Sequence, residues 1–469
     1  MWFLVVSSPF AINLKKKYFF SQYARTVGAS RLVRGSLLGF LLFAQIGCAS
    51  RLSATDDMRS VDKFGKIKQS LSAIRGLSFT QGIPIGYETK DAMRKYLEAD
   101  LIRDSGEENF KDIARAYVKL GLFPKGIDLK NTLLKLYAGR VAGFYDLREK
   151  KVVLPKSYYF VESGFDENAL VHELTHALQD QHFSLGHRLG LSRNGDKTLA
   201  FRALAEGDAL LTEFAYLHGG LDKGFSASVS QILQSNFGRL QSALSDVPAA
   251  VSEKLLFQYK AGASLVYRVL KDKGWPGVDL LYSSPPLSTK QVLHPEKYLE
   301  LPDPPTEIEL EDRASVFPAD WKEIENNTLG ELMVRCLFKR FFPEGEANRV
   351  ASGWAGDRFV TFRRGEEISL IWVTVWDSSG DAREFFRKYE EILSRKYRGS
   401  ETDGLKTYIE QRDQRVVVVE GLDRDRVKKN IEKIWQGMQL AKEAFKPSLL
   451  LGPAITDASD QNHATDLSR

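Results

Sequence analysis

Apolar positions in the first two-thirds of the chain repeat mainly at intervals of three and four residues, which places them on one face of an α-helix. This pattern predicts helices at residues 60–74, 89–102, 109–120 and 129–139, with turns at GIPIGYE and LFPKG. The period changes at residues 141–155, where two short runs flank a turn at 147–150. We therefore expect a β-hairpin there.

Helical spacing returns after the hairpin. Residues 166–183 and 198–218 each carry an apolar stripe, and Gly219-Gly220 marks the end of the second helix. A long amphipathic helix is predicted at 248–273, ended by Gly274-Trp275-Pro276-Gly277. A Pro-rich loop follows at 283–305, and its cluster of prolines at 302–305 indicates a domain boundary.

The last third mixes the two periods. Helices are expected at 329–342, 382–396 and 424–440, and strands at 358–363, 369–376, 407–411 and 415–420. The polar residues 446–469 are expected to be disordered. The fold class is thus α+β: a mainly helical domain at 49–306, with a small hairpin beside its central helix, and a smaller α+β domain at 307–445.

Composition places the chain among globular proteins of two or three domains, with 469 residues, 43% of them hydrophobic and 27% charged. The net charge of +5 is small and no nucleic-acid motif occurs, so we expect no nucleic-acid partner. Only Cys48 and Cys336 are present, which excludes a cysteine metal site. Cys336 lies in an apolar helical pattern and is expected to be a buried thiol.

The first 48 residues are typical of an export signal. Basic residues precede an apolar run at 37–44 that is too short to span a bilayer comfortably. The sequence Gly47-Cys48-Ala49-Ser50 resembles a bacterial lipoprotein cleavage site, with Cys48 as the lipidated residue. We expect an exported protein, periplasmic or held at the membrane of a bacterial envelope by a lipid anchor. A signal anchor that stays attached is the alternative.

The predicted helix at 166–183 contains HExxH, with His172, Glu173 and His176. Residues four apart lie one above the other on a helix, so both imidazoles can reach one metal ion. Glu173 lies beside that ion and can take a proton from a water molecule there. The alternative is a helix with two solvated histidines.

A catalytic zinc site needs a third protein ligand. Glu206 lies in the middle of the next predicted helix, directly after Ala203-Leu204-Ala205, and a carboxylate buried there needs a partner such as a metal. A surface glutamate is the alternative. Asp208 and Glu213 are weaker candidates, and Asp208 is expected either to orient a ligand histidine or to be solvated.

HExxH on one helix with a glutamate on the next resembles the gluzincin class of zinc metallopeptidases. VHELTHALQDQHF, ALAEGDA, PPLSTKQVLHPEKY, GWAGDR and WDSSGDAREF are similar to stretches of uncharacterised bacterial secreted or lipoprotein metallopeptidase-like proteins, and this likeness covers about residues 80–440. The resemblance implies a zincin-like domain and Zn²⁺ bound by His172, His176 and Glu206. The thirty positions from His176 to Glu206 exceed the compact thermolysin spacing.

The function expected is a zinc-dependent peptidase with Glu173 as general base, acting on a peptide or protein substrate. Possible oxyanion or substrate contacts are Tyr145, His182, His218 and His294. The alternatives are a packing aromatic in the hairpin for Tyr145 and a packing or turn residue for His294. The alternative function is a non-catalytic zinc-binding envelope lipoprotein with a structural or partner-binding role.

Overall fold

The computed structural model describes residues 54–138, 143–156, 167–191, 194–220, 244–311, 313–399, 406–442 and 445. The predicted leader with Cys48 and the predicted disordered tail at 446–469 lie outside these ranges. The described part is α+β, as expected. None of its helices is long and apolar enough to cross a membrane.

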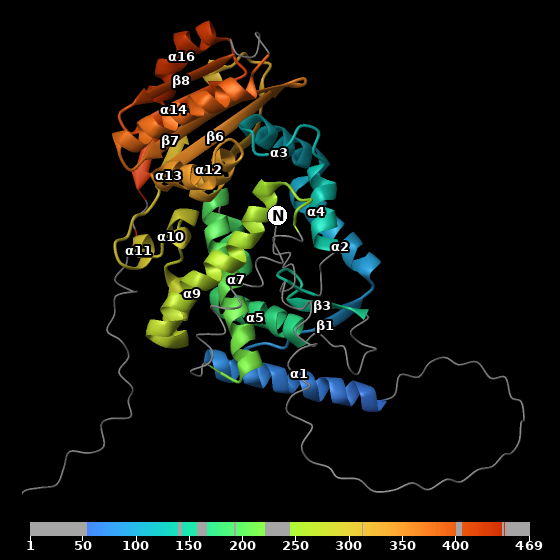
Figure 1. Ribbon diagram of the computed structural model, residues 1–469. Helices are drawn as coiled ribbons and strands as arrows, with labels where there is room; N and C mark the ends of the chain where they lie inside the picture. Colours follow the sequence, from blue (N-terminus) through green and yellow to red (C-terminus); the bar gives the residue numbers. More distant parts are fainter. Residues whose placement is uncertain are drawn as a thin grey trace, which may run out of the picture.

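The helical part begins with α1, which runs along one end of the molecule in Figure 1. Its other helices surround two central ones, α5 and α7. The bounds are α1 Ala54–Arg75, α2 Lys90–Ser105, α3 Glu107–Leu120, α4 Leu129–Ala138, α5 Glu167–Phe183, α6 Leu185–Leu191, α7 Gly195–His218 and α9 Ala249–Ser283. The helices predicted in this part are confirmed, with ends that differ by several residues. Helix α6 was not predicted, because its residues were expected to belong to a Gly-containing loop.

A three-stranded sheet lies beside α5 (Figure 1). Strands β2 Phe144–Asp146 and β3 Lys151–Pro155 form the predicted hairpin. The stretch GIPIGYE was expected to be only a turn, which is wrong, because Ile85–Glu88 forms β1 and pairs in parallel with β3. The pairing involves residues about 65 positions apart, which a local pattern cannot reveal.

The prediction that the long helix ends at Gly274 is also wrong. Gly274 leaves the helical region (φ 64°, ψ −168°), and the helix then resumes and runs to Ser283. Pro276 lies at the start of the resumed helix, where its missing N–H costs no hydrogen bond. The glycine and proline therefore produce a kink rather than an end.

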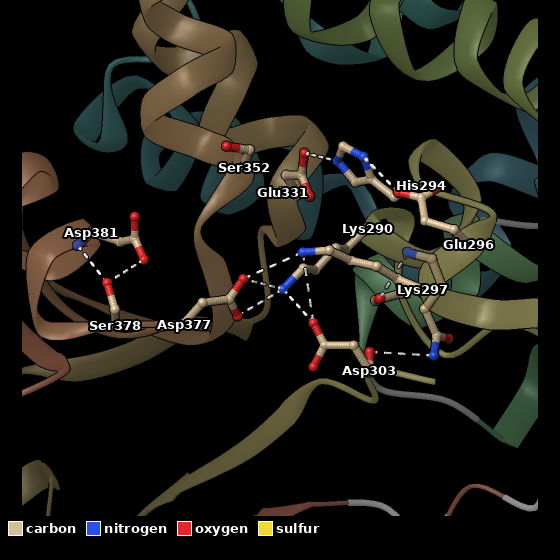
Figure 2. A network of polar contacts seen from close by, with 12 residues as sticks. Lys290, His294, Glu296, Lys297, Asp303, Glu331, Ser352, Asp377, Ser378 and Asp381 are labelled. Carbon is tan, nitrogen blue, oxygen red and sulfur yellow. Dashed lines mark hydrogen bonds and ion pairs between the residues drawn. The ribbon is translucent and has the colours of Figure 1, made fainter. Parts of the chain in front are cut away.

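The expected loop at 283–305 contains two short helices, α10 Thr289–Leu293 and α11 Glu296–Leu299. They carry a polar network that reaches the C-terminal region (Figure 2). Lys290 is almost fully buried and lies 2.6 Å from Asp303 and 2.8 Å from Asp377. Burial lowers the pKa of Lys290, but its bonds to these two carboxylates outweigh burial and raise it.

The C-terminal region contains an antiparallel sheet in the order β5-β6-β7-β9-β8, formed by Lys322–Asn327, Trp354–Arg364, Glu367–Trp376, Arg415–Glu420 and Thr407–Arg412. Side chains alternate across it: Leu370 and Trp372 pack with α14 (Ser379–Lys396), while Ile371 and Val373 pack with α16 (Arg424–Gln436). The short helices α12 (Gly330–Lys339), α13 (Glu344–Ser352) and η3 (Arg313–Val316) complete the region.

The predicted helix at 424–440 ends early, at Gln436, because Met438–Lys442 forms β10 and pairs with β4, Thr306–Leu310. This pairing joins the two ends of the C-terminal region. The main apolar core cluster contains residues from both sides of the predicted boundary at 306, from Leu101 to Val418. The boundary itself stays a prediction.

Candidate metal centre

Helix α5 lies at the centre of the helical part and is buried on all sides from Ala169 to Asp180. Its small and apolar residues contact the hairpin and α1 on one side and α7 on the other. His172 and His176 lie one turn apart within this stretch, with ring centroids 4.8 Å apart. Both imidazoles are almost completely inaccessible to solvent.

Helix α7 begins three residues earlier than predicted. The Asn194 side chain accepts hydrogen bonds from the N–H groups of Asp196 and Lys197, both at 3.0 Å. Gly219 ends the helix in the left-handed conformation (φ 74°), as expected. Between these ends, Glu206 is 3% exposed and directed toward α5.

The structure brings the three predicted ligands together. Glu206 Oε2 lies 3.3 Å from His172 Nε2 and 3.6 Å from His176 Nε2. One ligand atom from each of the three residues lies within 4.8 Å of the others, and in the part of the chain that the structure describes this is the group suited to a metal ion. Two imidazoles and one carboxylate are a donor set that suits zinc.

The second nitrogen of each histidine also has a partner, which fixes the orientation of the ring. His172 Nδ1 lies 3.3 Å from Glu213 Oε2, one of the acids that the sequence placed second to Glu206. His176 Nδ1 lies 2.9 Å from Gln179 Oε1. Both arrangements direct an Nε2 atom toward Glu206.

Asp208 supports His176 through Gln179 rather than directly. Gln179 Nε2 donates to Asp208 Oδ2 at 2.9 Å and to the carbonyl oxygen of Ala205 at 3.0 Å. Asp208 Oδ2 also accepts from Arg75 at 3.1 Å and from the Tyr282 hydroxyl at 2.9 Å. The last turn of α1 is thus connected to a ligand histidine by buried hydrogen bonds.

Glu173 is fully buried beside the three ligands. Its Oε2 accepts a hydrogen bond from the backbone N–H of Tyr145 at 2.8 Å. Its Oε1 has no hydrogen-bond partner among the residues that the structure describes. One carboxylate oxygen is therefore held by the hairpin, and the other is available to accept a proton.

The charges of the cluster depend on one another. Burial lowers the pKa of His172, but the hydrogen bond to Glu206 and the nearby Glu213 carboxylate outweigh burial and raise it to about 10. Burial raises the pKa of Glu206, but the two histidines outweigh burial and bring it to about 2. Burial raises the pKa of Glu173 to about 7. Three carboxylates around two imidazoles form an anionic pocket that favours a cation.

The residues therefore fit Zn²⁺. The donor set is appropriate, the supporting partners are in place, and Glu173 presents a buried carboxylate oxygen without a hydrogen bond. His172, His176 and Glu206 would hold the ion.

The other predicted contacts lie away from the ligands. The Tyr145 hydroxyl donates to Asp180 at 3.0 Å, so this residue touches the site through its backbone. His182 is exposed and contacts the carbonyl oxygen of Ser78. His218 contacts the carbonyl oxygen of Phe214, three turns beyond Glu206, or about 18 Å along α7. His294 lies 2.7 Å from Glu331 in the polar network of Figure 2.

Sequence reasoning missed Tyr259. This tyrosine of α9 is 1% exposed, its ring centroid lies 6.3 Å from that of His172, and its hydroxyl hydrogen-bonds to Glu206. Burial and the neighbouring carboxylates raise its pKa well above the ordinary value. The residue lies within an apolar helical pattern, LLFQYKAGASLVYRVL, in which a tyrosine gives no signal of its own.

Comparison with known proteins adds little at this site. A family model described as a domain of unknown function (DUF8575) matches residues 317–430, which hold the five-stranded sheet and not the metal ligands. No curated protein matches the chain. A crystal structure described as "a putative hydrolase with a novel fold" from Chloroflexus aurantiacus aligns with 52% of this chain and 89% of its own, at 19% identity and a TM-score of 0.34. A likeness at that level carries no argument about function.

Proposed function

We propose that the protein is a zinc-dependent hydrolase that cleaves peptide bonds. The observation that carries the proposal is the position of Glu173, which lies beside a His172–His176–Glu206 ligand set with one carboxylate oxygen bound to the hairpin and the other without a hydrogen bond. This arrangement is the one expected of a general base next to a metal.

Bound Zn²⁺ would polarise the scissile carbonyl and lower the pKa of a water molecule to about 7. Glu173 takes the proton of the attacking water and delivers it to the leaving amine. The Tyr145 N–H keeps the Glu173 carboxylate in one orientation while this happens. Glu213 and Gln179 keep the histidine rings in place.

Tyr259 is the donor best placed to stabilise the oxyanion. Its hydroxyl interacts with Glu206, one of the three proposed ligands, so a donor is present beside the proposed metal position. Burial and carboxylate neighbours keep it protonated, and it remains a donor. We assign this role to Tyr259 in preference to the four residues proposed from the sequence.

The competing function is a non-catalytic zinc protein. The observation that favours it is the burial of the three ligands, at 4% exposure or less for their side chains, because structural zinc sites are closed. Glu173 discriminates between the two functions. Burial of a carboxylate oxygen without a hydrogen bond costs free energy, and a purely structural zinc site has no use for such a group.

The proposal includes an envelope location, which rests on the predicted leader and Cys48. Labelling cells with a palmitate analogue tests it. Label on the wild type and not on Cys48→Ala supports a lipid anchor, and an unlabelled wild type contradicts it.

Zinc content is the deciding measurement for the site. Purified wild type should hold one zinc per chain by mass spectrometry, and Glu206→Ala should lose it, whereas Glu149→Gln, at an exposed position of the hairpin turn, should keep it. If Glu206→Ala retains zinc, the third ligand is a residue other than Glu206. Absence of zinc from the wild type after reconstitution would end the hydrolase proposal.

A further inference from the structure

A cavity of about 390 Å³ lies between the N-terminal halves of α7 and α9, with α3, α4 and α6 around it. Its volume is in the range of small-ligand sites. The interior is apolar, and its buried lining residues are Tyr117, Phe123, Leu129, Leu133, Leu136, Leu189, Leu199, Ala250 and Leu255. Transfer of an apolar group from water into this cavity is favourable in free energy, because its apolar surface is removed from water.

The polar side chains of the lining are half-buried and therefore reach solvent, and we call them the mouth of the cavity: Thr198, Arg202, Lys254, Gln258, Glu325 and Asn327. They comprise two cations and one carboxylate. Burial raises the pKa of Glu325, and Lys254 and Arg358 oppose that effect. The mouth therefore keeps an excess of positive charge and favours an anionic group.

Two helices that line the cavity also carry residues of the metal centre, one helical turn further along each. Gly195, Leu199 and Arg202 line it, and Glu206 is the next residue on the same stripe of α7, one turn or about 6 Å further on. On α9, Leu255 lines the cavity, and Tyr259 follows it by one turn.

The two helices cross just beyond these residues, at Gly207 and Gly262, where a Cβ atom on Gly207 would lie 2.2 Å from the carbonyl carbon of Gly262. The cavity thus lies on the N-terminal side of the contact between α7 and α9. Glu206 and Tyr259 each follow a lining residue, Arg202 and Leu255, by one helical turn.

We propose that this cavity binds a large apolar side chain of the substrate, and that Arg202 and Lys254 bind a carboxylate adjacent to that side chain. The ligand class is an apolar residue bearing a negative charge, either the free C-terminal carboxylate or an acidic residue next in sequence. The identification of the ligand as substrate rests on the proposed peptidase function, whereas the binding itself does not.

Calorimetry on the full chain tests the binding with three probes: N-acetyl-phenylalanine, its neutral amide, and N-acetyl-Phe-Asp-amide. We expect the first or the third to bind the wild type roughly tenfold more tightly than the amide, the usual size of one charge-assisted hydrogen bond. Preference for the first identifies a C-terminal carboxylate, and preference for the third an internal acidic residue. Equal binding of all three contradicts the carboxylate contact.

Variants locate the site. Lys254→Gln should remove the tenfold preference, and Lys260→Gln, an exposed lysine on the same helix, should keep it. Leu255→Trp fills the cavity and should abolish binding of all three probes. Val251→Phe, at a half-buried lining position, should do the same if Leu255→Trp does not fold. Unchanged binding in a folded filled variant overturns the proposal.

Cleavage of a mixed peptide library distinguishes failure of the cavity proposal from failure of the peptidase proposal. If probes bind as expected and no peptide is cleaved, the cavity stands and the peptidase proposal fails. If peptides are cleaved with the same preference by wild type and by the filled variant, the peptidase stands and the cavity assignment fails. Both stand if cleavage occurs next to phenylalanine, leucine or tyrosine and that preference disappears in the filled variant.

Discussion

The backbone N–H of Tyr145 and the carboxylate of Glu173 are joined by a 2.8 Å hydrogen bond between the hairpin and helix α5. The bond occupies one carboxylate oxygen and leaves the other buried without a hydrogen bond among the described residues. The hairpin therefore contributes to the site through its backbone, and the side chain of Tyr145 instead connects to Asp180.

Glu173→Gln should reduce peptide hydrolysis by roughly 100-fold or more, because general-base catalysis contributes on that scale. Glutamine keeps the shape and still accepts from Tyr145 through its carbonyl oxygen. Zinc content and thermal midpoint should therefore stay close to those of the wild type. A Glu173→Gln protein with undiminished hydrolysis would show that Glu173 is not the base.

Glu213→Gln should weaken zinc binding by about 10- to 100-fold, the usual effect of removing a group that orients a ligand histidine. The reason is the 3.3 Å contact with His172 Nδ1. Competition with a chelator of known affinity measures the change. Glu253→Gln, on the neighbouring helix α9 and away from the ligands, serves as the control and should bind zinc as the wild type does. If Glu213→Gln and Glu253→Gln bind zinc with the same affinity, Glu213 does not support the His172 ligand.

Tyr259→Phe should lower kcat by roughly 100-fold while zinc content is unchanged, as for loss of an oxyanion donor. The KM for a cleaved peptide should change far less, because the hydroxyl acts on the charge that develops in the transition state. Tyr267→Phe on the same helix is the matched control. A loss of zinc in Tyr259→Phe would show instead that the hydroxyl holds the Glu206 carboxylate in position to bind zinc.

Gly262→Ala should destabilise the protein by at least about 2 kcal/mol, since overpacking at a tight contact costs on that scale. A Cβ atom at this position would lie 1.9 Å from the carbonyl oxygen of Ala203. The helices must then separate, which displaces Glu206, so zinc binding should also weaken. Gly345→Ala, at an exposed position of α13 with nothing near its Cβ position, should leave both unchanged. Denaturant unfolding measures the difference.

The free energy of unfolding should decrease at acid pH because the carboxylate of Glu420 becomes protonated. Burial raises the pKa of this carboxyl, but Lys396 and Lys119 outweigh burial and lower it below the ordinary 4.5. A group with a lowered folded-state pKa stabilises the protein above its unfolded pKa, and that contribution is lost as pH falls through the folded value. Unfolding free energy should therefore decrease below about pH 4.5.

Glu420→Gln should show a shallower decrease over that range, and Glu366→Gln, an exposed position, should follow the wild type. The same acid slope in Glu420→Gln and the wild type would exclude this carboxyl as its source.

Much of the helical structure was predictable because it is local. The three- and four-residue repeat in α3, α5 and α7, the HExxH spacing and the terminal Gly219 all act within one helix. The β2–β3 hairpin is local as well. Strands β1, β4, β5 and β10 were missed because their partners lie far away in the sequence, and short strands carry little signal alone.

At the site, the sequence by itself determined that His172 and His176 share a helix face and that Glu173 lies between them, since helix geometry imposes both. It also indicated Glu206, from its small and apolar neighbours. Only the tertiary structure decided that Glu206 meets the histidines, that Glu213 and Gln179 orient them, and that Tyr259 reaches the cluster. These contacts depend on how α5, α7 and α9 cross, and that crossing is set by close approach at Gly207 and Gly262 rather than by any local pattern.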